Sequence, residues 1–88
     1  FKSVDEVIDR ANRLEFGLAS YAFTNDPKIV NALRSQIQAG LLAVNSTAVS
    51  TPETPFGGVK HSGYGSEGGS EGLEAFLVTR FISEIYNI

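Results

Sequence analysis

The sequence predicts an α/β fold: a strand–helix–strand (βαβ) unit, a long glycine-rich loop, a short helix and a terminal strand. Three observations support this prediction. Apolar residues in the range 4–14 recur at spacings of three and four, as on one face of a helix. Two short apolar segments, 18–24 and 41–44, flank a second helical pattern. Seven of the nine glycines fall between Gly57 and Gly72, where neither period holds.

The first helix is predicted to run from Val4 to about Leu14. Ser3 and Glu6 have the spacing of a capping box, in which each side chain accepts a hydrogen bond from an unpaired backbone N–H group. Gly17 follows the expected end of the helix and is predicted to cap it. The apolar positions that define the buried face are Val4, Val7, Ile8, Ala11 and Leu14.

The next segments predict one βαβ unit. Residues 18–24 and 41–44 are short and apolar, and their lack of polar alternation favours a sheet covered on both faces. Between them, Asp26 is a good N-cap and Pro27 suits the first helical position. Gly40 is predicted to end this helix as a left-handed C-cap. A strand, a helix and a strand in this order normally give a parallel strand pair.

After Asn45 the regular pattern stops until Gly69, and a connection of this length is usually functional or covered by another segment. A short helix is then expected, with Ser70 as its cap and Leu73, Phe76 and Leu77 on one face. Residues 78–85 follow as a final strand whose two faces are both mixed. That pattern suits a sheet extended by another chain, although an ordinary terminal strand is the alternative.

Composition narrows the function classes. The chain has 88 residues, 42% of them hydrophobic and 19% charged, which indicates one small globular unit. A formal charge of −3 argues against a nucleic-acid or anionic-membrane surface. There is no cysteine, which excludes a disulfide, a thiolate metal site and a cysteine nucleophile within these residues. Phe1 opens a sequence without methionine, which predicts a piece of a longer protein.

The glycine-rich loop contains one apparent dinucleotide-binding motif. Gly63 to Gly68 reads G-x-G-x-x-G, but this pattern is meaningful only directly after a strand, where it opens a helix. Neither element is expected here, so a loop that needs glycines is the better interpretation. The nucleotide-binding alternative predicts affinity for NAD in the isolated chain.

Other polar residues of the loop have two interpretations each. In a covered loop the Glu67 carboxylate could have a shifted pKa, as functional carboxylates often do. The alternative is that it only accepts hydrogen bonds from the loop's own N–H groups. Lys60 is expected to bind backbone carbonyls. His61, the only histidine, lacks partners at metal-ligand spacing and is interpreted as an exposed loop residue. Hydroxyls that suit either a ligand or a turn are provided by Ser46, Thr47 and Ser50.

These motifs together resemble the C-terminal part of the NAD(P)-dependent aldehyde dehydrogenase superfamily, with succinate-semialdehyde dehydrogenases among the members nearest in pattern. The resemblance covers essentially the whole chain, although Phe16 stands where tyrosine is commoner. The matching segments are Phe16-Gly17-Leu18-Ala19-Ser20, Phe23-Thr24, Ala39-Gly40, Val44-Asn45, Pro55-Phe56-Gly57-Gly58-Val59-Lys60, Ser62-Gly63, Gly65 and Glu67-Gly68.

The resemblance implies an oxidoreductase that converts an aldehyde to a carboxylic acid with NAD or NADP. Its catalytic cysteine, its glutamate base and its cofactor domain are expected upstream of Phe1, so this chain alone is expected to be inactive. Residues 1–78 are then part of the catalytic domain, and residues 79–88 are the oligomerisation strand of a homodimer or homotetramer. A cytoplasmic location is expected.

The resemblance also implies site residues. Val49 and Ser50 are expected to line the aldehyde pocket, with Phe56 as an apolar wall. Ser50 stands where members that act on succinate semialdehyde bind the distal carboxylate, which favours a semialdehyde substrate.

Two further roles follow from subfamilies of these enzymes. Glu67 matches a proton-relay residue, although Ser66 replaces a commoner arginine beside it. Lys60 and Gly63 match positions whose main-chain carbonyls bind potassium. The alternative to all these roles is a self-standing α/β module that binds a partner without catalysis.

Overall fold

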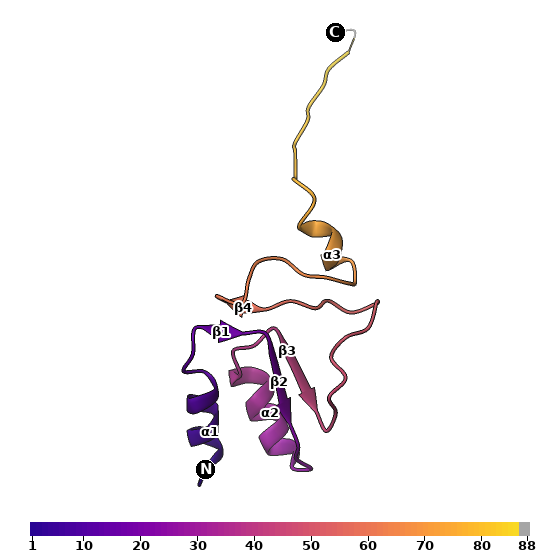
Figure 1. Cartoon of the computed structure of the whole chain (residues 1–88). Helices are drawn as coiled ribbons and strands as arrows, with labels where there is room; N and C mark the ends of the chain where they lie inside the picture. Colours follow the sequence, from indigo (N-terminus) through magenta and orange to yellow (C-terminus); the bar gives the residue numbers. More distant parts are fainter. Residues whose placement is uncertain (87–88) are drawn as a thin grey trace.

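The computed structural model describes residues 1–86, and its centre is a parallel βαβ unit (Figure 1). Strands β2 (Ala19–Ala22) and β3 (Leu41–Val44) pair in register from Ala19↔Leu41 to Ala22↔Val44. Helix α2 (Pro27–Gln36) connects them, and the Asp26 carboxylate accepts a 2.9 Å hydrogen bond from the Lys28 N–H. The predicted strand–helix–strand order and the N-cap are therefore confirmed.

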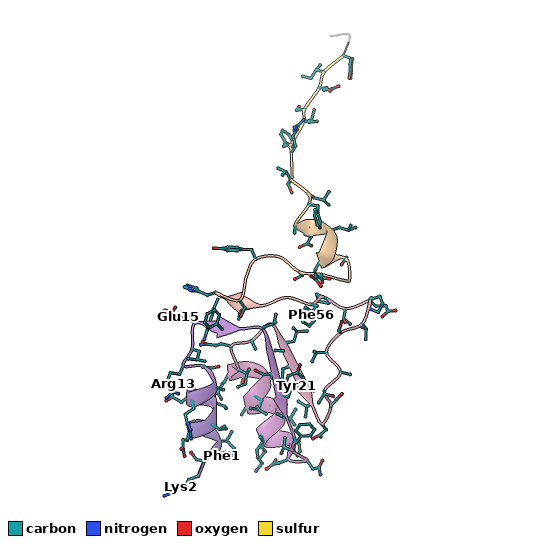
Figure 2. All side chains as sticks on the ribbon, in the orientation of Figure 1. Phe1, Lys2, Arg13, Glu15, Tyr21 and Phe56 are labelled. Carbon is teal, nitrogen blue, oxygen red and sulfur yellow. The ribbon has the colours of Figure 1, made fainter. Side chains whose placement is uncertain are left out.

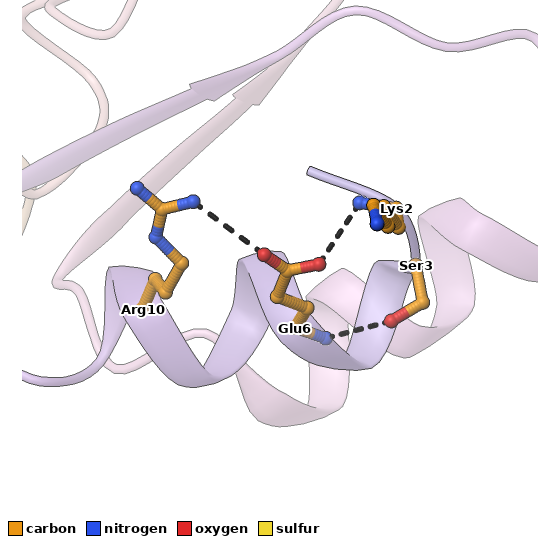
Figure 3. Close-up of polar contacts among 4 residues, drawn as sticks. All are labelled: Lys2, Ser3, Glu6 and Arg10. Carbon is orange, nitrogen blue, oxygen red and sulfur yellow. Dashed lines mark hydrogen bonds and ion pairs between the residues drawn. The ribbon is translucent and has the colours of Figure 1, made fainter.

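Helix α1 (Val4–Ala11) begins at the predicted cap but ends before Leu14. The Glu6 N–H donates to the Ser3 hydroxyl at 3.2 Å. The Glu6 carboxylate accepts from the Lys2 N–H at 2.9 Å, one residue earlier than a full capping box requires, and also lies 3.6 Å from Arg10 (Figure 3). Only half of the predicted capping box therefore forms.

The early end of α1 has a tertiary cause. The Asn12 amide donates to the Gln36 carbonyl at 2.7 Å and its oxygen accepts from the Gln38 N–H at 2.8 Å. These two bonds tie the end of α1 to the end of α2. Gly17 is not a helix cap, contrary to the prediction, because it lies in a strand.

That strand belongs to a second, antiparallel pair, which was not predicted. Strand β1 (Phe16–Gly17) pairs with β4 (Val59–Lys60), with Phe16 opposite Lys60. Strand β4 lies inside the segment expected to be an irregular loop. The Gly17 N–H also donates to the Ser62 hydroxyl at 2.7 Å, so the glycine-rich segment is attached to the start of β2.

Gly40 has a different role from the predicted helix cap. Helix α2 ends at Gln36, with Ile37 as its C-cap, and Gly40 is not among the glycines with positive φ. A Cβ atom on Gly40 would overlap the Gly57 carbonyl. This glycine therefore allows close approach of two backbone segments.

Beyond the glycine-rich loop the chain is extended and exposed. Helix α3 (Glu71–Glu74) is a single turn with Ser70 at its N-cap position, as predicted, but the Ser70 side chain makes no capping bond. The Ser70 hydroxyl bonds the Glu71 carboxylate at 3.3 Å instead. Residues 78–86 project away from the rest of the molecule without a strand partner in the described range (Figure 1). The predicted oligomerisation strand stays a prediction, and its residues 87 and 88 lie outside the described residues.

The described chain has a small core. Only Ile8, Leu33 and Ala43 are buried hydrophobic residues in the range 1–86. Tyr21 is 49% and Phe23 71% exposed, so the expected covering of the sheet on both faces is incomplete here. The radius of gyration is 18.5 Å, against about 12 Å for a compact domain of this length. No helix within residues 1–86 is long and apolar enough to cross a membrane.

Candidate active-site loop

The predicted substrate loop (residues 46–59) leaves β3 at Asn45, whose backbone and side chain are both hydrogen-bonded. Asn45 has φ 57°, and its N–H donates to the Ala22 carbonyl at 2.8 Å. Its side chain accepts from the Thr24 N–H at 2.9 Å and donates to the Thr24 carbonyl at 2.8 Å. The ends of β2 and β3 are therefore joined at the point where the loop begins. Asparagine tolerates positive φ, so its position directly after a predicted strand was a sequence signal that the chain turns and is held there.

Val49 and Ser50 lie in the following irregular segment. Val49 is half-buried and Ser50 is exposed. A turn follows at once, in which the Thr51 and Thr54 hydroxyls lie 2.7 Å apart and the Thr54 N–H donates to the Thr51 carbonyl at 3.2 Å. The Ser50 hydroxyl makes no hydrogen bond within the described part of the chain. It is therefore available to a ligand.

Phe56 and Glu67, two predicted site residues, are brought together by their backbones. Their N–H and carbonyl groups exchange hydrogen bonds of 2.6 and 2.7 Å as an isolated bridge. Phe56 is half-buried, on the segment that passes the amino-terminal ends of β2 and β3 (Figure 2). The Glu67 carboxylate is exposed in this chain. Its backbone thus satisfies a loop N–H group, while its proton-relay role stays a prediction.

Lys60 binds backbone carbonyls, as one interpretation of the sequence predicted. Its ammonium donates to the Asn12 carbonyl at 2.9 Å and to the Leu14 carbonyl at 3.0 Å. A cation at the C-terminal end of a helix interacts favourably with the exposed carbonyls there. Within the described residues no group of three or more His, Asp or Glu side chains is placed to hold a metal. The potassium site at the main-chain carbonyls of Lys60 and Gly63 stays a prediction.

His61 is exposed, as expected. Its Nδ1 lies 3.5 Å from the Glu15 carboxylate, and its ring meets Phe16 edge-on at 6.5 Å between centroids. Its backbone N–H donates to the Glu15 carbonyl at 2.8 Å. These contacts attach the glycine-rich segment beside β1 and indicate a structural position for His61.

The G-x-G-x-x-G spacing does not form a dinucleotide site in this chain. Strand β4 ends at Lys60, and Gly65 and Gly68 have φ of 72° and 68° in the loop that follows. A Cβ atom on Gly68 would lie 2.5 Å from the Thr54 carbonyl oxygen, so this glycine allows packing against the substrate loop. Within residues 1–86, only the four-residue helix α3 comes after it. The residues present therefore do not fit a nicotinamide cofactor by themselves.

A mainly apolar cavity lies elsewhere. It has a volume of about 440 Å³ and is open between α1, β2 and α2, with mainly apolar walls. Val49, Ser50 and Phe56 do not line it. The described residues therefore supply parts of the predicted substrate site without enclosing it.

A parallel βαβ unit with a long loop and few buried residues is typical of a portion of a larger α/β fold. The aldehyde dehydrogenase family profile matches residues 1–82, and the chain belongs to this family. The resemblance inferred from the sequence is thus confirmed.

Three relatives show the extent of the similarity. A 4-(hydroxymethyl)benzenesulfonate dehydrogenase of Comamonas testosteroni is 54% identical over 82 residues, which are 93% of this chain and 17% of that protein. A non-phosphorylating aspartate-semialdehyde dehydrogenase of Halomonas elongata is 42% identical over 92% of this chain and 16% of its own length. The crystal structure of succinate-semialdehyde dehydrogenase from Burkholderia pseudomallei matches with a TM-score of 0.84 and 37% identity, over 89% of this chain and 16% of that one. The chain therefore spans about a sixth of these relatives.

Proposed function

We propose that this chain is the C-terminal catalytic and subunit-contact part of an NAD(P)-dependent aldehyde dehydrogenase that oxidises an aldehyde bearing an anionic group to the carboxylic acid. The observation that carries the proposal is the family match over residues 1–82. The substrate loop and glycine-rich loop, joined by the Phe56–Glu67 bridge, are the parts of this chain that serve that reaction.

The chain supplies substrate contacts and not the nucleophile. Without a cysteine, it depends on residues outside these 88 for the covalent step, in which a thiolate attacks the aldehyde carbon. NAD or NADP accepts the hydride and is also bound outside this chain. The role left to Ser50 and Phe56 is to bind and orient the aldehyde, which lowers the entropic cost of reaching the transition state.

An anionic substrate is favoured by two lines of support. The Ser50 hydroxyl is exposed and free to donate a hydrogen bond, and donation to a charged acceptor is worth more than donation to a neutral one. The names of the three relatives specify a sulfonate or a semialdehyde with a carboxylate. A small carboxylate- or sulfonate-bearing aldehyde, such as succinate semialdehyde, is therefore the proposed substrate class.

The test compares two aldehydes of matched length in the full-length protein. Succinate semialdehyde carries a distal carboxylate and butanal does not. Replacing Ser50 with alanine should lower kcat/KM for succinate semialdehyde about tenfold, the effect of losing a hydrogen bond to a charged group, and that for butanal less than about twofold. Ser35→Ala, at an exposed serine of α2, is the control. Equal losses for both aldehydes in Ser50→Ala would exclude a carboxylate-binding role.

The proposed protein is a homodimer or homotetramer of the cytoplasm, with residues 79–88 at a subunit contact. The exposed tail supports this, since Phe81 and Ile85 are 89% and 75% exposed in the isolated chain. The self-standing interaction module is less well supported, because a chain with three buried hydrophobic residues in the described range has little core of its own.

A further inference from the structure

Two residues that bracket the substrate loop have unusual backbone conformations. Asn45 (φ 57°) and Lys60 (φ 55°) are the non-glycine residues with positive φ in the part of the chain that the structure describes. This conformation is disfavoured for residues with a side chain, more so for lysine than for asparagine, and persists only where surrounding contacts determine it. The substrate loop, residues 46–59, lies between them.

The two residues act at opposite ends of the βαβ unit. Asn45 bonds the Ala22 carbonyl and both backbone groups of Thr24 at the carboxyl ends of β2 and β3. Strand β4, which ends at Lys60, lies near the amino ends of β2 and β3 (Figure 1), and the Lys60 ammonium reaches the end of α1. The substrate loop therefore runs back along the whole unit from one fixed point to the other.

The Lys60 end of the substrate loop is attached to the ends of two helices. Its ammonium bonds the Asn12 and Leu14 carbonyls, where α1 has ended and its carbonyls lack helical partners. Asn12 is in turn bonded to Gln36 and Gln38 at the end of α2. The ammonium thus connects the substrate loop to α1 directly and to α2 through one residue.

Apart from Val59, which pairs with Gly17 of β1, the loop is bonded to itself or to the glycine-rich segment. The Ala48 N–H donates to the Ser46 hydroxyl at 3.0 Å, and the Gly69 N–H donates to the Pro52 carbonyl at 2.9 Å. The Phe56–Glu67 bridge is of the same kind. These bonds let the substrate loop and the glycine-rich segment move together, so only attachments near the two ends fix them to the βαβ unit.

We propose that Asn45 and Lys60 are a pair of positioning residues that clamp the two ends of the substrate loop and thereby hold Val49, Ser50 and Phe56 in one arrangement for the aldehyde. The role toward the aldehyde rests on the proposed function, whereas the clamping of the loop does not. Neither residue needs to touch the substrate. The β1–β4 pairing, the His61 N–H and the Ser62 hydroxyl also attach the Lys60 end.

The experiment measures amide hydrogen exchange and aldehyde kinetics in the full-length protein. Lys60→Gly and Asn45→Gly keep the positive φ without strain but delete the side-chain bonds, so they isolate the clamps from the backbone conformation. Lys60→Arg restores a cation. Lys28→Met is the matched control, since its ammonium makes no hydrogen bond within residues 1–86.

Both glycine variants should exchange about fivefold faster in residues 46–59, with α2 and β3 unchanged. KM for succinate semialdehyde should rise by about the same factor while kcat changes less than about twofold. Lys60→Arg should recover part of both effects, and Lys28→Met should match the unmodified protein.

If residues 46–59 exchanged at the same rate in the glycine variants as in the unmodified protein, the clamp would be overturned. Equal acceleration in α2 and β3 would also overturn it, because that indicates a general loss of stability. Faster loop exchange with unchanged KM would overturn the positioning role toward the aldehyde. A protein that oxidises no aldehyde would refute the proposed function, while the exchange data would still decide whether the loop is clamped.

Discussion

The isolated 88-residue chain should not fold as a stable cooperative unit. Its accessible surface is 7349 Å², whereas a compact protein of 9.4 kDa exposes about 5000 Å². The excess is about 2300 Å². Somewhat more than half of a protein surface is apolar, and burial contributes about 25 cal/mol per Å² of apolar area. The chain therefore lacks up to about 30 kcal/mol of hydrophobic stabilisation.

That deficit is larger than the net stability of a typical domain, about 5–15 kcal/mol, so it decides the outcome even if the true value is half as large. The assay is urea unfolding of the isolated chain followed by far-ultraviolet circular dichroism, with dye binding as a probe of exposed apolar surface. We expect a broad or absent transition and strong dye binding. A chain without residues 79–88 is the control, because the extended tail accounts for part of the excess surface.

A sharp two-state transition of the isolated chain, with an m-value appropriate to about 88 residues, would refute this reasoning. It would also revive the self-standing module as a function. Dye binding that stays low in a soluble monomer would lead to the same conclusion.

Two further predictions concern the full-length protein. Gly40→Ala should lower the free energy of unfolding by about 1–3 kcal/mol, measured by chemical denaturation, because its Cβ overlaps the Gly57 carbonyl. Gly72→Ala, whose Cβ meets nothing closer than 3.4 Å, should leave it nearly unchanged, and equal effects would contradict the close-approach role. Deleting residues 79–88 should reduce the oligomeric state in analytical ultracentrifugation, since this segment is proposed to pair with a partner subunit. If the truncated protein kept the same number of subunits, the subunit contact would lie elsewhere.

Residues near in sequence were predicted well because their signals are local. The Ser3 cap of α1 and the Asp26 cap of α2 act over two or three residues, and β3 has the predicted bounds. The family was also predicted correctly, because its motifs are spread along nearly the whole chain. The prediction that the Lys60 side chain binds backbone carbonyls was confirmed, although the sequence did not indicate which carbonyls.

Only the tertiary structure decided which distant segments meet. The end of α1 depends on Asn12 contacting Gln36 and Gln38, and the role of Gly40 depends on the approach of Gly57, near the end of the substrate loop. Neither contact has a local signature, because each is formed by loop closure between segments at least 17 positions apart in the sequence. Sequence alone thus determined the family, the starts of α1 and α2 and the order of the βαβ unit. The G-x-G-x-x-G spacing of the glycine-rich segment suggested a nucleotide site. The folded chain showed instead that backbone contacts and the Lys60 ammonium attach this segment to the rest of the molecule.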